Sequence, residues 1–487
     1  MTLEIIGHSH AYEMECIARL FYPGERIEVA HHMDENREER LTTRMEKDGE
    51  RVTLFAAVRA SGKSQEGRDS FAACDDDWEW EVQRRLGLLL FDLLCTATGT
   101  RPPWGVLTGV RPVNLCRKML GRFGLSEGQL AATLTQSYRV LPQKAELALS
   151  VMRAQKVVFE SDRPRGYSLY VNIPFCPTRC LYCSFVSHAV SQAAGLLPDY
   201  LSLLGKELTA LGETAGSLGL KLRSVYIGGG TPTTLLAEQL WALLSTIEKS
   251  FPMRGVLEYT VEAGRPECTT KEKLEVLKSF GVSRISVNPQ TMDDTILEAI
   301  GRGHTAAQTL ECMSAAREVG FDSVNMDLIA GLPGQSMDSF CDSLERVLAL
   351  RPENITVHTL TVKRASNLRG NPSAFEKSAP VGDMVEFAAT RLRQVGYLPY
   401  YLYRQQGAPH NLENTGYCLP GKEGIYNIYS MEDSHTILAA GAGGVTKLCA
   451  PSGEVARIRA YKYPYEYIAG YQNLLGRKRG IAKFFER

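Results

Sequence analysis

Three cysteines, Cys176, Cys180 and Cys183, form the tightest group of reactive side chains in the sequence. They are four and three residues apart in the segment YVNIPFCPTRCLYCSF. Thiolates are soft ligands that suit zinc or an iron–sulfur cluster. Structural zinc needs four ligands, and His188 is the candidate for the fourth. Three local thiols instead favour a [4Fe–4S] cluster with one open iron, which can bind the amino and carboxylate groups of S-adenosylmethionine (SAM).

A glycine run and an acidic residue farther along the chain could bind that nucleotide. Gly228, Gly229 and Gly230 let the backbone approach a ligand closely, and with Thr231 they are predicted to seat the methionine part of SAM. Glu262 can accept from the ammonium group, although a lone acid at a strand end is more often solvated.

Three more polar residues follow or interrupt apolar segments. Arg302 offers a planar fork for the methionine carboxylate. Asp327 lies in the apolar run MDLIA, where a carboxylate is costly to bury without hydrogen bonds. Ribose hydroxyls would provide them, and a helix cap or a core salt bridge is the alternative. Gln290 follows another predicted strand and completes the candidate set.

From about residue 166, short apolar strands alternate with helices. The predicted strands are Ser168–Ile173, Ser224–Ile227, Glu258–Glu262, Arg284–Val287, Ser323–Ile329 and Asn354–Thr359. The predicted helices are Asp199–Leu211, Leu236–Lys249, Lys271–Ser279, Ala306–Val319 and Ser336–Leu350. This alternation predicts an α/β fold, an incomplete (β/α)6 barrel with right-handed crossovers. Functional groups of such barrels lie where the strands end, so the cysteines and polar residues are expected to share one edge.

The flanking regions have other patterns. Residues 1–165 are predicted to form an N-terminal α/β domain with a helical connector, residues 166–370 the barrel, and residues 371–487 a mixed C-terminal extension. The N-terminal strands are expected at Leu3–Gly7, Arg26–His31 and Arg51–Ala60. The helices are expected at Trp78–Thr98, Pro112–Phe123, Ser126–Gln136 and Gln143–Val158.

Bulk composition excludes several classes of protein. The 487 residues are 44% hydrophobic and 23% charged with zero net charge, which gives no reason to expect a nucleic-acid partner. No apolar run approaches the ~20 residues that span a bilayer, and the first residues lack a secretion-signal pattern. We therefore expect a cytoplasmic protein without a membrane partner. The nine cysteines outside the cluster are interpreted as small buried hydrophobes.

The motifs, taken in order, resemble a known family. YVNIPFCPTRCLYCSF, GGGTPT, TVEAGRP, GVSRISVNPQT, IGRGH and MDLIAGLPGQ are similar to the radical SAM oxygen-independent coproporphyrinogen III oxidases. WGVLTGVRP, VHTLTVKRAS and MEDSH resemble the HemZ-type coproporphyrinogen dehydrogenases within that family. The resemblance implies a [4Fe–4S] cluster on the three cysteines, SAM, and anaerobic haem biosynthesis. The implied reaction is oxidative decarboxylation of two propionates of coproporphyrinogen III to give protoporphyrinogen IX.

The same resemblance implies roles for individual residues. It assigns SAM contacts to Tyr170, Tyr182, Gly229, Gly230, Thr231, Glu262, Gln290, Arg302, Asp327 and Thr361. Phe185 stands where the better-known oxidases have a further cysteine, and Asn172 where they have a histidine. Both changes also occur in relatives regarded as haem chaperones. A haem-binding chaperone, a radical SAM haem-degrading methyltransferase and an iron–sulfur protein without a reaction are therefore the alternatives.

The tetrapyrrole substrate of such an enzyme carries four carboxylates, which need cationic anchors beside a flat apolar slot. The candidate substrate contacts are Asn172, Lys363, Arg364 and Arg404, with Tyr400, Tyr401 and Tyr403 as walls. The expected protein partner is a reductant of the cluster, such as flavodoxin or ferredoxin. The reaction also needs an electron acceptor, which the sequence does not identify.

Overall fold

The structure of the chain, a computed structural model, describes residues 1–34, 37–60, 62–73, 78–161, 165–184, 188–361, 380–405, 408 and 411–486. It divides into two compact units. Unit 1 contains Met1–Leu149 and Tyr403–Glu413, and unit 2 contains Ser150–Leu402 and Asn414–Arg487. This division falls within helix α5 (Pro142–Ser161), and it differs from the predicted boundaries after residues 165 and 370.

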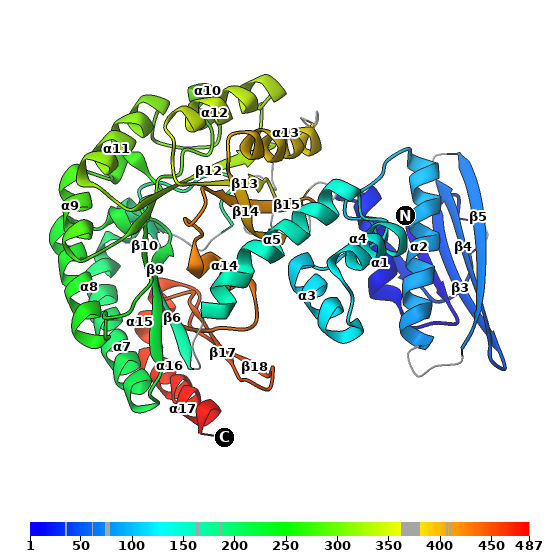
Figure 1. The fold of residues 1–487 in the computed structure, drawn as a ribbon, viewed down its shortest axis with the longest axis horizontal. Coiled ribbons are helices and arrows are strands. Elements are labelled where there is room, and N and C mark those ends of the chain that lie inside the picture. The colour runs from blue at the N-terminus through cyan, green and yellow to red at the C-terminus, as the bar shows by residue number, and fades with distance from the viewer. Residues whose placement is uncertain are drawn as a thin grey trace. The chain divides into compact units, whose positions relative to one another are not determined.

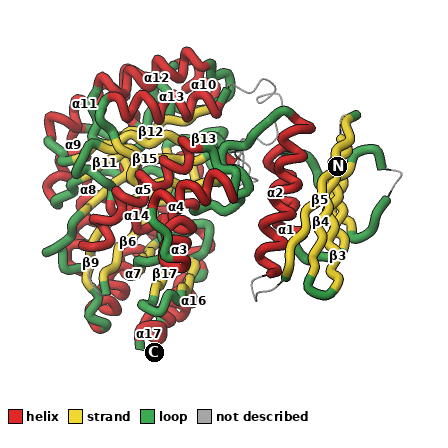
Figure 2. Tube along the Cα trace, turned by 45° about the vertical axis from the view of Figure 1, so that its right-hand side comes forward, coloured by secondary structure: helices red, strands yellow, loops and turns green. Residues whose placement is uncertain are grey.

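Unit 1 begins with a mixed five-stranded sheet in the order β2-β1-β3-β4-β5. Its strands are β1 (Thr2–Ile6), β2 (Glu28–Ala30), β3 (Arg40–Asp48), β4 (Arg51–Ala60) and β5 (Lys63–Ala72). Helices α1 (Ala11–Phe21) and α2 (Trp78–Thr98) lie beside this sheet (Figure 2). Leu3, Leu54, Leu86 and Leu90 are fully buried in the core between these layers.

The helical part of unit 1 contains α3 (Pro112–Phe123), α4 (Glu127–Ala132), a π-helical turn (Thr133–Ser137) and the start of α5. Ser126 begins α4 with a capping box, because its hydroxyl accepts from the Gln129 amide and the Gln129 side chain accepts in return. The returning segment Tyr403–Glu413 is held to this part by Glu413. Its carboxylate accepts from Lys144 Nζ at 2.6 Å and from Trp104 Nε1 at 2.7 Å.

Replacing Lys144 by methionine is expected to lower the free energy of unfolding by about 3–5 kcal/mol, because the buried carboxylate of Glu413 would lose the ammonium group that lies 2.6 Å from it. The two side chains are 4% and 1% exposed. Lys156→Met is the matched control on the same helix, since Lys156 is 74% exposed and lies 3.8 Å from Glu160. It should change stability by less than about 0.5 kcal/mol. Equal urea-unfolding midpoints for the two variants would refute the role given to Glu413.

Unit 2 is built on an eleven-stranded sheet in the order β14-β15-β13-β12-β11-β10-β9-β6-β16-β17-β18. Its six central strands run parallel, which confirms the incomplete barrel. These strands are β6 (Gly166–Ile173), β9 (Lys221–Gly229), β10 (Glu258–Glu262), β11 (Arg284–Ser286), β12 (Ser323–Ala330) and β13 (Asn354–Thr359). Short strands β7 (Phe175–Cys176) and β8 (His188–Ala189) pair separately.

Helices form the outer layer of the barrel, one after another around the strands (Figure 1). They are α7 (Leu197–Ser217), α8 (Ala237–Ser250), α9 (Lys271–Ser279), α10 (Asp294–Ala299), α11 (Ala306–Val319) and α12 (Met337–Ala349). The short helix α6 (Val190–Ala193) follows β8. Apolar residues at helical spacing face the strands, as Leu240, Leu244 and Ile247 of α8 do. Among the described residues, no helix is long and apolar enough to cross a membrane.

The C-terminal region extends the same sheet at both edges. β15 (Glu413–Cys418) pairs antiparallel with β13, and β16 (Thr436–Ala440) pairs parallel with β6. The other strands are β14 (Leu398–Arg404), β17 (Val445–Cys449) and β18 (Val455–Arg459). The helices are α13 (Val381–Gln394), α14 (Ile425–Met431), α15 (Pro464–Ala469), α16 (Tyr471–Lys478) and α17 (Gly480–Phe485). Residues 414–487 thus pack as part of the barrel unit.

Candidate active site

The three cysteines lie in the loop that follows β6, at the C-terminal edge of the parallel strands. Cys176 ends β7, and the amide of Cys183 donates to the carbonyl of Cys180 at 3.2 Å. The amide of Leu181 donates to the Ile300 carbonyl at 3.0 Å, which fixes the loop against the end of α10. Cys180 is buried and the other two are partly buried. The loop therefore holds the thiols at the edge where the barrel's functional groups are expected.

Two of these thiols receive hydrogen bonds from side chains of neighbouring strand ends. Thr231 Oγ1 donates to Cys176 Sγ at 3.5 Å, and Arg265 Nη1 donates to Cys180 Sγ at 3.3 Å. Sequence reasoning missed Arg265, although it belongs to the quoted motif TVEAGRP. One feature of the sequence could have identified it, because Arg265 is a cation that follows a predicted strand by three residues at the predicted functional edge.

The donor set of the loop bears on the kind of metal centre that the thiols suggest. In the described part of the chain, no three His, Cys, Asp or Glu side chains are placed to hold one metal ion. His188 packs edge-on against Tyr463 and Tyr465, with ring centroids 6.1 and 6.3 Å away, and its buried Nε2 has no partner among the described residues. Three thiols in one loop suit a four-iron cluster with one open iron, because each cysteine binds a different iron.

The glycine run after β9 is joined directly to the cysteine segment. The Gly230 amide donates to the Ile173 carbonyl at 2.8 Å, and the Thr231 amide donates to the Phe175 carbonyl at 2.7 Å. A Cβ on Gly230 would lie 2.5 Å from the Phe175 carbonyl oxygen. Gly229 has φ +107°, and a Cβ there would lie 1.6 Å from Asn172 Oδ1. Both positions require glycine, which leaves bare backbone facing the site.

Glu262, the last residue of β10, is an acid that titrates near neutral pH. Its Oε1 accepts from the Tyr226 hydroxyl at 2.6 Å. Burial raises the pKa of Glu262 to about 7, and the charge of Asp327 acts in the same direction. The rings of Tyr226, Tyr170 and Tyr426 form a stacked group, in which the Tyr226 centroid lies 6.2 Å from that of Tyr170 and 4.3 Å from that of Tyr426. A ligand ammonium beside Glu262 would favour the carboxylate, as the predicted SAM contact requires.

SAM binding is expected to strengthen as the pH rises from 5.5 to about 7. The carboxylate is the binding form, so a protein with protonated Glu262 must release a proton, which costs roughly a factor of ten in affinity per pH unit below its pKa. Anaerobic isothermal titration of cluster-loaded protein measures this slope. Glu262→Gln should bind SAM more weakly with a flat pH profile. A flat profile in the unmodified protein would contradict the assignment.

Two other predicted SAM contacts carry buried polar atoms that have no partner among the described residues. Arg302 donates through Nη1 and Nη2 to the Gly264 and Asn288 carbonyls, both at 3.0 Å, while its buried Nε has no acceptor in the described part of the chain. Gln290 has φ +70°, and no described residue donates to its buried Oε1. A left-handed backbone on a residue other than glycine is strained and is common at ligand sites. These orphaned atoms fit a polar ligand at this edge.

Asp327 is held as a carboxylate within β12. Asn325 Nδ2 donates to its Oδ1 at 2.7 Å, and His358 Nε2 lies 3.6 Å from its Oδ2. Burial alone would raise the pKa of Asp327, but the hydrogen bonds and charge of its neighbours, His358 first among them, lower it below its usual value. Asp327 lies within a strand and caps no helix, but its pairing with His358 matches the other alternative interpretation, a salt bridge in the core. The carboxylate stays 17% exposed.

The remaining predicted SAM contacts lie at the ends of the same strands. Tyr170 lies in β6, and its hydroxyl donates to Asn172 Oδ1 at 3.0 Å. Tyr182 lies in the cysteine loop and packs against a group of buried apolar side chains that includes Ile300. Thr361 follows β13, is buried, and donates through Oγ1 to the Thr359 carbonyl at 3.3 Å. Their elements converge on the edge that carries the cysteines.

Two of the four predicted substrate contacts, Lys363 and Arg364, lie outside the described residues. Phe185 also lies outside them. Asn172 is 7% exposed and its amide is engaged on both sides, by Tyr170 and by the Ala442 carbonyl. Asn172 therefore supports Gly229 and the turn after β16 instead of presenting its amide to a substrate.

Arg404 has a structural role that the sequence did not indicate. It belongs to unit 1, is 2% exposed, and donates to the carbonyls of Leu107, Gly109 and Asn411. Its guanidinium also lies over the Trp104 ring, 5.4 Å from the centroid. These contacts give Arg404 a structural role, and its buried Nη2 has no partner among the described residues, so its predicted role as a carboxylate anchor stays a prediction.

The predicted tyrosine walls are also packing residues. Tyr400 is fully buried, and its hydroxyl accepts from Arg284 Nη2 and from Asn427 Nδ2, both at 3.2 Å. The buried Tyr401 ring fills the space that a side chain at Gly416 would need. Both rings therefore stabilise the join between the added C-terminal strands and the barrel.

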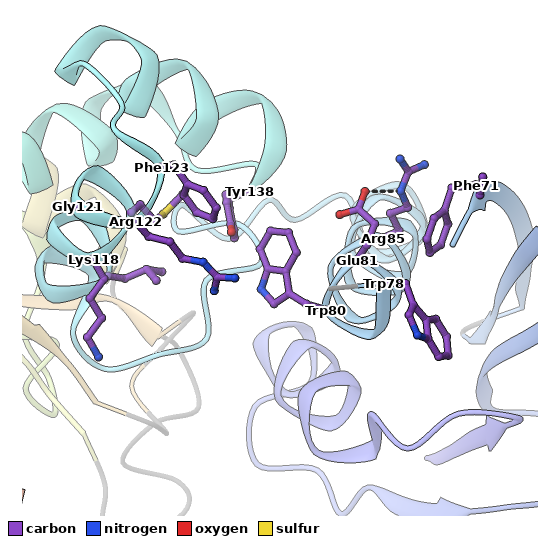
Figure 3. Close-up of a pocket in the computed structure, with 13 residues that line it drawn as sticks. Phe71, Trp78, Trp80, Glu81, Arg85, Lys118, Gly121, Arg122, Phe123 and Tyr138 are labelled. Atoms are coloured by element: carbon purple, nitrogen blue, oxygen red, sulfur yellow. Dashed lines mark hydrogen bonds and ion pairs between the residues drawn. The ribbon is translucent and has the colours of Figure 1, made fainter. Parts of the chain in front are cut away.

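A cavity of about 760 Å³ occurs in unit 1 and contains none of the predicted site residues. Figure 3 shows Trp80 of α2 pointing toward Tyr138, with Arg122 and Phe123 nearby. Arg85 and Phe71 lie on the other side of α2, where Arg85 pairs with Glu81 at 2.6 Å (Figure 3). The residues that line the cavity belong to unit 1, and the candidate active-site residues belong to unit 2.

Comparison with known proteins agrees with this geometry. The family model described as the Radical SAM superfamily matches residues 170–347. The oxygen-independent coproporphyrinogen-III oxidase-like protein HemZ of Bacillus subtilis is 36% identical, over 97% of this chain and 96% of that protein. The haem chaperone HemW of Haemophilus influenzae is 32% identical, over 62% of this chain and 76% of the relative. The solved structure of HemN, the coproporphyrinogen III oxidase of Escherichia coli, covers 66% of this chain and 72% of its own, with a TM-score of 0.53 and 22% identity.

The barrel, the three-cysteine loop and these matches define a radical SAM protein, a class whose cofactors are a [4Fe–4S] cluster and SAM. The thiol donors, the glycine seat and the orphaned polar atoms described above fit both cofactors. Within that class, the chain belongs to the family of HemZ-like, oxygen-independent coproporphyrinogen-III oxidase-like proteins.

Proposed function

We propose that this protein catalyses the SAM-dependent, oxygen-independent oxidative decarboxylation of coproporphyrinogen III to protoporphyrinogen IX. The observation that carries the proposal is the 36% identity to the oxidase-like HemZ protein along 97% of the chain. The match to the haem chaperone HemW covers 62% of the chain. The full-length similarity supports a shared function for both units, including the N-terminal region.

The side chains of unit 2 would bind and orient the two cofactors. The three cysteines hold the cluster, Glu262 accepts from the SAM ammonium, and Arg302 donates to its carboxylate. Gln290 and Asp327 bind the ribose hydroxyls. When bound, the cluster and SAM supply an electron and the group that removes hydrogen from the substrate, chemistry that protein side chains do not provide.

Each of the two propionates loses one β-hydrogen and its carboxyl group, which leaves as carbon dioxide, and becomes a vinyl group. Bound SAM would supply the acceptor of that hydrogen, and an external acceptor would take the one further electron that this change releases. A low-potential reductant such as flavodoxin or ferredoxin would supply the electron that starts each round. Both redox partners are therefore part of the proposal.

Anaerobic incubation of the cluster-loaded protein with reductant, SAM and coproporphyrinogen III tests this function. We expect carbon dioxide and a monovinyl intermediate, followed by the divinyl product.

The similarity to HemW favours a second candidate function, that of a haem chaperone. Asn172 and Phe185 also favour this candidate. Tight haem binding with SAM cleavage but no carbon dioxide would support the chaperone and refute the oxidase. Ring-opened product from haem would indicate degradation instead.

A further inference from the structure

Arg265 is a buried cation in contact with one of the cysteine ligands. It follows β10 by three residues and is 3% exposed. Nη1 donates to Cys180 Sγ at 3.3 Å and to the Thr178 carbonyl at 3.2 Å, and Nη2 donates to Thr178 Oγ1 at 2.7 Å. The guanidinium thus touches both the backbone of the cysteine loop and a sulfur atom that the cluster needs.

Glu267 balances part of this charge. Its Oε1 lies 2.7 Å from Arg265 Nε and 2.5 Å from Nη2, and its Oε2 lies 3.4 Å from His304 Nδ1. Glu267 is 16% exposed in its side chain, so solvent screens the pair weakly. Cation and carboxylate therefore form a dipole whose positive end faces Cys180.

We propose that Arg265 is a positioning residue that raises the reduction potential of the cluster, and that Glu267 limits this effect. Reduction adds one electron, from an external low-potential donor, to a cluster whose ligands are thiolates. An N–H···S bond and a nearby positive charge stabilise the added negative charge, and they do so strongly where water is excluded. The inference concerns the cluster and does not depend on which tetrapyrrole the protein acts on.

The contact to Thr178 offers a simpler explanation, in which Arg265 only anchors the loop. The two roles differ in what they predict for the cluster that remains after substitution. An anchor affects how much cluster assembles but leaves its reduction potential unchanged. A charge donating to Cys180 changes the potential itself.

Redox titration of reconstituted holoprotein, followed by electron paramagnetic resonance, separates the roles. For Arg265→Gln we expect at least a tenfold fall in the equilibrium constant for reduction, which is about 59 mV for a one-electron couple. Arg265→Lys keeps the charge and should shift the potential less. Glu267→Gln removes the balancing carboxylate while its amide oxygen still accepts from Arg265, so the potential should move in the opposite, positive direction.

Lys271→Gln is the control for loss of one positive charge, because Lys271 is exposed and pairs with Glu318 at 2.8 Å. It should leave the potential unchanged. If Arg265→Gln fails to retain iron, Glu267→Gln decides the question, since it keeps every contact between Arg265 and the cysteine loop. An unchanged potential in Glu267→Gln, or in an iron-replete Arg265→Gln, would overturn the proposal.

Discussion

Cys180→Ala is expected to lose the iron–sulfur cluster and to reduce turnover by about a thousandfold or more, because the reaction depends on chemistry that the cofactor alone supplies. Cys180 is the most buried of the three thiols and the one that Arg265 contacts. Without it, two thiols remain for a cluster that needs three, and Arg265 loses its acceptor. Iron and sulfide content after anaerobic reconstitution, together with carbon dioxide release, measures both effects.

Cys341→Ala provides the matched control for this loss. Cys341 lies on α12, is partly exposed, and is not one of the three loop cysteines. This variant should contain as much iron as the unmodified protein and retain its activity. Full cluster content in Cys180→Ala, or an equal loss in both variants, would mean that the loop cysteines do not hold the cluster.

Gly230→Ala should disrupt the site through its backbone. The added methyl group would lie 2.5 Å from the Phe175 carbonyl oxygen and 2.8 Å from that of Ile173, so the segment leading to Cys176 must move. Overpacking of this kind costs about 1–3 kcal/mol. If the glycine run moves to relieve that strain, the backbone that binds the methionine part of SAM is displaced. The affinity for SAM then falls by about ten- to a hundredfold. Titration of cluster-loaded protein with SAM measures the change.

Gly216→Ala is the control for adding a methyl group, because a Cβ at this position of α7 meets no atom within 4 Å. It should bind SAM normally and be slightly more stable, since alanine favours a helix. The result for Gly229→Ala should resemble that for Gly230→Ala, because Asn172 Oδ1 and the positive φ both oppose a side chain there. Normal SAM binding by Gly230→Ala would contradict the close backbone approach.

The barrel could be predicted because its signals are local in sequence. Each parallel strand is a short apolar run followed by an amphipathic helix, and helices such as Lys271–Ser279 and Ala306–Val319 agree with prediction at both ends. The candidate site was predicted by the same rule, since its residues lie within these strands or in the loops that follow them. Topology then brings together side chains as distant as Cys176 and Asp327.

Some elements were missed because long-range pairing sets them and others because their local pattern is weak. β16 lies beside β6 although more than 250 residues separate them, and nothing in a local pattern specifies that register. In unit 1, β5 (KSQEGRDSFA) was missed because an edge strand with one solvated face lacks a clear apolar alternation.

The structural surroundings of charged residues were hard to predict where no motif gave their context. The sequence predicts Arg404 as a substrate anchor because a C-terminal cation beside tyrosines suits a carboxylate, yet the structure buries it among carbonyls of unit 1. Arg265 drew no prediction although it contacts Cys180. Burial and the identity of a cation's acceptor are tertiary properties, and composition does not encode them.

The most direct test of the central claim follows a hydrogen atom from substrate to nucleotide. Coproporphyrinogen III deuterated at the β-carbons of its propionates would be incubated anaerobically with SAM, reductant and the reconstituted protein. The 5′-deoxyadenosine formed would then be analysed by mass spectrometry. We predict deuterium in this product, in step with release of carbon dioxide. Unlabelled 5′-deoxyadenosine without carbon dioxide would contradict a coproporphyrinogen-decarboxylating radical SAM enzyme.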